Sequence, residues 1–188
     1  MKTIAILSLL LFIASALNPS FANETDQSKQ LKTLYFDAAR NGDIELLQTF
    51  YKAGLSVNIA NEKGYTALIL SAYNGQTETV NFLLDVDDIN PCQEDARGNT
   101  ALMGAIFKGN LRIAKSLMGR DCEVDQTNQN GQTALMFATL FDRQNIIEEL
   151  IDQGANISLK DSHSRSLSDI AASQGNLSLA DKFKQSKP

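Results

Sequence analysis

The chain has 188 residues, of which 43% are hydrophobic, and this content suits one hydrophobic core of ordinary size rather than two. Its 22 acidic residues outnumber its 17 basic residues, and the sequence pI is about 4.9. A surface that follows nucleic-acid phosphates needs an excess of basic side chains in order to release counterions. The composition therefore favours one acidic domain and argues against a nucleic-acid partner.

The first 22 residues have the pattern of a cleaved secretory signal peptide. Lys2 provides a positive start, "IAILSLLLFIASAL" is an apolar stretch, and Ser20-Phe21-Ala22 has the small-x-small form of a cleavage site. A membrane span needs roughly 20 apolar residues, and this stretch is shorter. We therefore expect cleavage after Ala22, export to the periplasm or out of the cell, and no membrane anchor afterwards.

The mature protein is expected to begin with a flexible segment over residues 23–28. Cleavage removes one basic residue and no acid, which leaves 16 basic against 22 acidic residues and a formal charge of −6. The exported protein is therefore expected to be acidic.

From residue 29 onward the sequence repeats with a period of 33 or 34 residues. The segments "GYTALILSAYNGQ" from Gly64, "GNTALMGAIFKGN" from Gly98 and "GQTALMFATLFDR" from Gly131 align without gaps. Two further segments, "LKTLYFDAARNGD" from Leu31 and "SRSLSDIAASQGN" from Ser164, fit the same spacing. The spacing indicates five units, which we place at residues 29–60, 61–93, 94–127, 128–160 and 161–185.

Each unit is predicted to contain two short helices. Thr66, Thr100 and Thr133 stand where a hydroxyl would cap the first helix, and apolar residues follow at spacings of three and four, as on one helical face. In most units a glycine separates the two helices, and a return segment such as "QGANIS" closes the unit. Leu102 and Leu135 are the expected central core residues of their first helices.

These features together resemble the ankyrin repeat, whose period is 33 residues and whose signature is T-P-L-H-x-A. The resemblance covers about residues 29–185. It implies an all-α solenoid of helix-turn-helix units joined by β-hairpin-like loops, with the first and last units acting as caps. The chain departs from the signature by alanine in place of the proline (Ala67, Ala101, Ala134) and by an apolar residue in place of the histidine (Ile69, Met103, Met136). Without that histidine, contacts between repeats are expected to depend more on apolar packing.

The sequence is poor in the residues that catalysis or metal binding requires. His163 is the one histidine, and it is a loop neighbour of Ser162, so no nucleophile–base pair is expected. Cys92, Cys122 and His163 are fewer than the four ligands of a structural zinc site. The "DVDD" segment lacks the spaced acids and final glutamate of a calcium loop, and the glycines form no phosphate-binding loop. We therefore expect no enzyme, no cofactor and no metal.

The two cysteines are predicted to remain unbridged. Cys92 lies six residues before Gly98, whereas Cys122 lies nine residues before Gly131, so the two occupy different repeat positions. An extended segment rises about 3.3 Å per residue, and this offset added to the repeat separation exceeds the roughly 7 Å limit on the Cα separation of a disulfide. Cys122 is expected to be buried and Cys92 to lie nearer the surface.

The ankyrin resemblance implies that a partner docks on one concave face, made by the hairpin tips and the outer ends of the first helices. The matching positions are rich in aromatic, leucine and basic residues on an otherwise acidic protein. Aromatic and arginine side chains dominate interface hot spots, and exposed apolar patches mark binding surfaces. The alternative is that Phe107 and Phe141 fold inward as additional core. The predicted partner-binding residues are Arg40, Tyr65, Tyr73, Arg97, Phe107, Lys108, Leu140, Phe141 and Arg165.

Two classes of function fit this pattern. The first is a monomeric, exported scaffold that binds a protein partner, and the second is a carrier of a small ligand such as haem, with Tyr65 or Tyr73 as the iron ligand. A deep pocket is unusual in a stacked solenoid, so the scaffold is favoured. The chain also resembles small exported bacterial ankyrin proteins, which implies a periplasmic catalase or another oxidative-stress enzyme as a partner. A secreted effector that binds another cell's proteins fits the same pattern.

Overall fold

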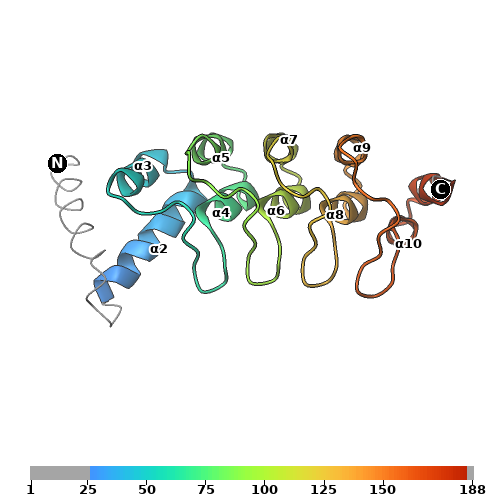
Figure 1. Ribbon diagram of the computed structural model, residues 1–188, viewed down its shortest axis with the longest axis horizontal. Helices are drawn as coiled ribbons and strands as arrows, with labels where there is room; N and C mark the ends of the chain where they lie inside the picture. Colours follow the sequence, from blue (N-terminus) through green and yellow to red (C-terminus); the bar gives the residue numbers. More distant parts are fainter. Residues whose placement is uncertain (1–25, 186–188) are drawn as a thin grey trace.

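The computed structural model describes residues 26–185. Within these residues it shows ten α-helices, which follow one another as five pairs (Figure 1). The first helices of the pairs are α2 (Asp26–Asn41), α4 (Ala67–Tyr73), α6 (Ala101–Lys108), α8 (Ala134–Leu140) and α10 (Leu167–Ser173). The second helices are α3 (Ile44–Lys52), α5 (Thr77–Leu84), α7 (Leu111–Met118), α9 (Gln144–Asp152) and α11 (Leu177–Gln185). The predicted all-α repeat solenoid is confirmed.

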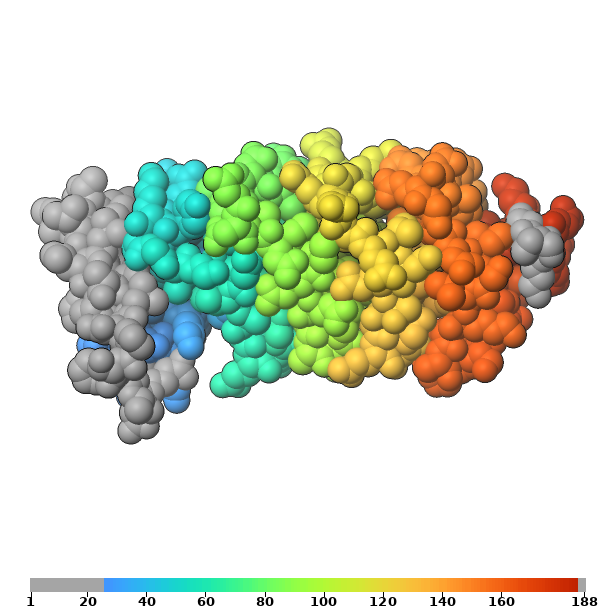
Figure 2. Space-filling view, viewed as in Figure 1, coloured from blue at the N-terminus to red at the C-terminus, as the bar shows by residue number. Residues whose placement is uncertain are grey.

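The pairs stack side by side in chain order, so that each packs on its neighbours (Figures 1 and 2). The long loops that join one pair to the next project to the same side of the stack, beside the first helices (Figure 1). We call these loops finger 1 (residues 53–66), finger 2 (85–100), finger 3 (119–133) and finger 4 (153–166). In the described residues, β-bridges form at the bases of fingers 1 and 2, joining Ala60 to Thr66 and Glu94 to Thr100.

The N-terminal helix is longer than the sequence pattern predicts. α2 begins at Asp26, so the last three residues of the segment over 23–28, which the sequence pattern assigns to a flexible start, are helical. The sequence from Asp26 to Asn41 contains neither glycine nor proline, and Leu31 packs against the core, so the helix extends by propensity and by packing. The predicted signal peptide at residues 1–22 lies outside the described residues.

One hydrophobic core runs through all five pairs. Leu135 is only 1% exposed, as expected for a central core residue. Leu102, at the same repeat position, is half-buried, because it lies at the edge of the core beside a cavity of about 30 Å³. Within the described part of the chain, no helix combines the length and apolar character needed to cross a bilayer.

Polar side chains tie neighbouring repeats together in addition to this core. In the second, third and fourth helix pairs, the residue that follows the inter-helix turn (Gln76, Asn110 or Arg143) donates to a backbone carbonyl near the end of the first helix of the preceding pair. Gln76 Nε2 donates to the oxygen of Arg40 at 2.8 Å, and Asn110 Nδ2 donates to the oxygen of Ala72 at 2.8 Å. These hydrogen bonds add to the apolar packing that was expected to compensate for the family's missing histidine.

An asparagine or aspartate at the base shapes each finger. In every case the Oδ1 atom accepts backbone N–H bonds from the residues two and four positions later, at 2.7–3.0 Å. Adjacent fingers also join through their backbones, as when the Ala96 amide donates to the Lys63 oxygen at 2.9 Å. A Cβ on Gly64, whose φ is +75°, would lie 2.4 Å from the Ala96 nitrogen, so this approach requires glycine. The four base residues are Asn61, Asp95, Asn128 and Asp161.

Asp161 is the most buried charged member of this set. It is 5% exposed, and its Oδ2 accepts from Arg165 Nε at 2.8 Å and pairs with Arg165 Nη2 at 2.7 Å. Burial alone raises the pKa of Asp161. The bonds from the Arg165 side chain and from the amides of Arg165 and His163 outweigh burial, so that this pKa lies below its ordinary value of 3.8.

We predict that Asp161→Asn lowers the free energy of unfolding by about 1 kcal/mol at pH 7, because Asn keeps the turn but loses the partly exposed ion pair. Folding lowers the pKa of Asp161, so its ionised form stabilises the native state. That stabilisation is complete above the unfolded-state pKa of about 4 and is lost as the pH falls through the folded-state pKa. Urea unfolding measured from pH 7 down to pH 2 should show the free energies of unfolding of the wild type and the variant converging as the pH falls. A difference in free energy of unfolding between the two proteins that stays constant with pH would contradict this account.

The two cysteines form a disulfide, with Cα atoms 5.5 Å apart, so the prediction of unbridged thiols is wrong. The prediction assumed an extended chain from Ile89 to Cys92, but this segment turns, and the Gln93 amide donates to the Asn90 oxygen at 3.4 Å. The turn removes the expected offset. Cys92 and Cys122 are both half-buried, which also corrects the expectation that only Cys122 would be buried. The bond joins finger 2 to finger 3 across a repeat interface.

Candidate functional site

A groove of about 650 Å³ lies between the fingers and the first helices of the stack. Its walls come from the ends of α2, α4, α6 and α8 and from fingers 1 to 3, the side of the molecule on which the loops project in Figure 1. Five residues predicted from the sequence line it, namely Arg40, Tyr65, Tyr73, Arg97 and Phe107. The helix-to-finger geometry thus brings together residues from four repeats.

Aromatic rings from successive repeats form a continuous row along the helix side of the groove. The Tyr73 and Phe107 rings stack with their centroids 5.9 Å apart, and Phe107 meets Phe141 edge to face at 5.0 Å. Phe137 extends the row, with its centroid 6.4 Å from that of Phe141. We call these four residues the aromatic row. The repeat period places Tyr73 and Phe107 at equivalent helix ends, and Phe141, one position further along in its own repeat, continues the row.

Two members of the aromatic row, Tyr73 and Phe107, lie outside the core, whereas Phe137 packs against it. Tyr73 is 41% exposed and Phe107 is 42% exposed, so the alternative that Phe107 folds inward is wrong. Phe141 is half-buried because it packs on Phe107 and Phe137 at the surface of the stack. Exposed aromatic side chains in contact with one another form the kind of apolar patch that marks a binding surface.

Basic side chains accompany the aromatic row. The Lys108 Nζ atom lies 5.0 Å from the centroid of the Tyr73 ring, within cation–π range. Arg97 and Lys63 line the groove from the tips of fingers 2 and 1. Arg40 also lines it, but its Nη1 is paired with Asp37 Oδ1 at 2.6 Å. The groove therefore has an aromatic wall and a basic wall.

Four of the predicted residues do not line the groove. Lys108 and Phe141 lie next to its lining, in contact with Tyr73 and Phe107 respectively, and the other two lie elsewhere. Leu140 is half-buried and packs against the hydrophobic core. Arg165 lies in finger 4, where its guanidinium pairs with Asp161. Their repeat positions match those of groove residues, but local packing in the last two units directs them elsewhere.

Sequence reasoning missed several residues that shape the groove. Phe137 lines it, and its position four residues before Phe141, one helical turn away, was a usable signal. Gly104 also lines it, and a Cβ there would lie 3.8 Å from the Tyr73 Cδ2 atom, so the ring rests against the bare helix backbone. Met103 adds an apolar side chain next to this point. The last two contributions depend on how the repeats stack.

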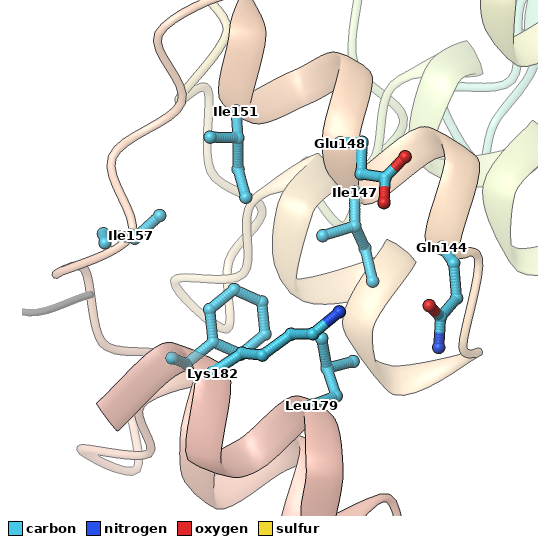
Figure 3. Close-up of a pocket in the computed structure, with 8 residues that line it drawn as sticks. Gln144, Ile147, Glu148, Ile151, Ile157, Leu179 and Lys182 are labelled. Atoms are coloured by element: carbon cyan, nitrogen blue, oxygen red, sulfur yellow. The ribbon is translucent and has the colours of Figure 1, made fainter. Parts of the chain in front are cut away.

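A second, smaller cavity of about 180 Å³ lies between α9 and α11 (Figure 3). Ile147 and Ile151 project into it from α9, and Leu179 faces them from α11, with Glu148 and Lys182 at the rim. Its lining is mainly apolar. None of the residues predicted to bind a partner lines it.

The described residues do not assemble catalytic or metal-binding chemistry. Among them, no group of three or more His, Cys, Asp or Glu side chains could hold a metal ion. Ser162 Oγ and His163 Nδ1 are 3.5 Å apart on an exposed finger, beyond the roughly 3 Å reach of a working nucleophile–base pair. Tyr65 and Tyr73, considered as haem ligands, line the open groove, where the Tyr73 ring already contacts Phe107 and Lys108. This arrangement suits binding of a protein surface.

Comparison with known proteins agrees with the helix-pair geometry. The family model described as "Ankyrin repeats (3 copies)" matches residues 35–128 and residues 105–183. The two matches together span most of the chain. The chain belongs to the ankyrin repeat family.

Similar proteins share these repeats in quite different contexts. The putative ankyrin repeat protein YahD of Escherichia coli (strain K12) is 27% identical over 185 residues, which cover 78% of this chain and 92% of that protein. A putative ankyrin repeat-containing protein of Treponema pallidum is 32% identical over 64% of this chain and 41% of its own length. A Caenorhabditis elegans homolog of transient receptor potential cation channel subfamily A member 1 is 31% identical over 77% of this chain but only 12% of its own length.

Proposed function

We propose that this chain is an exported scaffold that binds its protein partner in the groove. Ankyrin repeat proteins are in general non-enzymatic binding scaffolds, and membership of the family indicates a protein–protein interaction role. The observation that carries the groove assignment is the exposed aromatic row beside basic side chains, because aromatic and basic residues contribute most to interface hot spots.

Two independent observations support export. The first is the signal-peptide pattern of residues 1–22. The second is the disulfide between Cys92 and Cys122, because such bonds persist in oxidising compartments and are rare in the cytosol. Both fit a periplasmic or secreted protein. A periplasmic catalase or another oxidative-stress enzyme is the partner we propose to test first, on the basis of the resemblance to small exported ankyrin proteins.

We predict that Phe107→Ser combined with Phe141→Ser abolishes partner capture and changes the melting temperature by only a few degrees. The reason is that Phe107 is 42% exposed and packs mainly within the aromatic row, so the change removes contact surface with little loss of core. Capture is measured by affinity purification of tagged mature protein from a periplasmic extract. Bound proteins are identified by mass spectrometry and assayed for catalase activity.

The matched control is Ile151→Ser combined with Leu177→Ser. These two residues are 40% and 66% exposed and lie at the C-terminal end of the stack, outside the groove lining. The control should retain capture. Undiminished capture by a folded Phe107/Phe141 variant would reject the groove as the binding site, and loss of folding would assign both rings to the core.

A further inference from the structure

We propose that the groove selects an acidic segment of its protein partner, with an aliphatic or aromatic side chain of that segment seated on the aromatic row. This inference rests on the proposed function, since it names the chemistry of the partner that the groove would take. It is argued from the charges that the fold leaves unpaired in the groove and from the acidic surface around it.

Three basic side chains of this face have no carboxylate partner within 4.0 Å among the described residues. They are Lys63, Arg97 and Lys108. Lys63 and Arg97 line the groove from the finger tips, and Lys108, next to the lining, lies over the ring of Tyr73 on the helix side. An incoming carboxylate can therefore meet a cation from either wall without first displacing an internal ion pair.

The one acidic side chain of the groove lining is already engaged in its own finger. Asp95 Oδ1 accepts the Arg97 amide at 2.7 Å and the Asn99 amide at 2.8 Å, and Oδ2 accepts from Asn99 Nδ2 at 3.1 Å. These bonds hold the finger turn, so Asp95 stabilises the loop that presents Arg97. The groove thus keeps a net excess of available positive charge.

The rest of the molecule has the opposite character. The whole chain carries a formal charge of −5, and exposed acids lie along the second helices and the turns that follow them. A basic groove on an acidic body attracts an acidic partner by long-range steering and disfavours a basic one by repulsion from the groove. The exposed acids of these helices and turns include Glu45, Glu78, Asp85, Asp87, Asp88, Glu148 and Asp152.

Charge alone does not account for the groove, because its helix side is apolar. Tyr73 and Phe107 stay about two-fifths exposed, and the buried side chains of Ile69 and Met103 complete the apolar side of the lining. Burial of these rings makes the free energy of binding more favourable when the partner covers them with an apolar side chain. The occupant that satisfies both walls has acidic residues next to an aliphatic or aromatic one.

The test is a selection from random 12-residue peptides displayed on phage, with the disulfide-bonded mature chain as bait. Sequencing of the selected pool should show enrichment of Asp and Glu together with Phe, Leu, Ile, Trp or Tyr relative to the starting library. The affinity of individual selected peptides should fall as sodium chloride is raised, because the groove cations are exposed to solvent.

The decisive comparison uses the triple variant Lys63→Glu, Arg97→Glu and Lys108→Glu. It should bind the selected peptides about tenfold or more weakly, and its own selection should enrich Lys and Arg in place of Asp and Glu. The matched control reverses three exposed cations elsewhere, Lys52, Arg112 and Arg120, to glutamate. The net charge changes equally in both variants, and each loses one lysine from the last turn of a helix, so only position differs.

Peptides without acidic enrichment, or binding that the triple variant and the control weaken equally, would overturn the inference. A selection that yields no groove-dependent peptide would overturn it as well. The proposed function has a separate readout, since Phe107→Ser with Phe141→Ser tests groove binding without changing charge. Loss of capture in that variant, together with unchanged capture by the triple variant, would leave the groove as the binding site and reject an acidic occupant.

Discussion

Replacing Leu135 by alanine is expected to lower the free energy of unfolding by roughly 2 to 5 kcal/mol. Leu135 is 1% exposed and lies on α8, which packs against α6, α9 and α10, so truncation leaves a cavity where four helices meet. Domains of this size have only about 5 to 15 kcal/mol of stability. Urea unfolding followed by far-ultraviolet circular dichroism measures the loss, and the melting temperature should fall by roughly 5 °C or more.

Leu102→Ala is the matched control for this change. It makes the same truncation at the same repeat position, but Leu102 is half-buried at the edge of the core. Leu102→Ala should therefore lower the free energy of unfolding by clearly less than Leu135→Ala does. Equal costs at the two positions would mean that Leu102 is as well packed in solution as Leu135.

Removing the disulfide is expected to have a comparable effect on stability. The bond closes a sequence separation of 30 residues, for which loop-closure entropy in the unfolded chain corresponds to about 3 to 4 kcal/mol. Replacing Cys92 and Cys122 together by serine should lower the free energy of unfolding by about this amount. Because the bond joins fingers 2 and 3, its removal should weaken mainly the interface between the second and third helix pairs.

The measurement is urea unfolding of the wild type and the double serine variant, each with and without a reducing agent. Reductant should destabilise the wild type to the level of the variant and leave the variant unchanged. A reductant effect on the variant would point to a different cause. An oxidised wild type no more stable than the variant would show that native-state strain offsets the entropic gain.

Much of the architecture follows from short-range patterns that can be read along the chain. The 33- or 34-residue period, the hydroxyl caps and the apolar spacing predict the helix pairs, because a helix start and a buried face depend on residues within one or two turns. Thr66, Thr100 and Thr133 each accept the amide three residues later at 3.2–3.3 Å, as this pattern predicts. Tyr73 and Phe107 were identifiable for the same reason, since the period aligns them with Leu140, and Phe141 follows directly after Leu140.

Other features depend on contacts between residues about 30 positions apart, which no local pattern specifies. A turn over residues 90–93 brings Cys92 to Cys122, although their repeat positions differ. Stacking decides that Phe107 remains exposed, whereas Leu140, at the same repeat position, packs on the core. Each of these outcomes depends on the position of one repeat relative to the next, and that position is determined by packing and hydrogen bonds across the repeat interface.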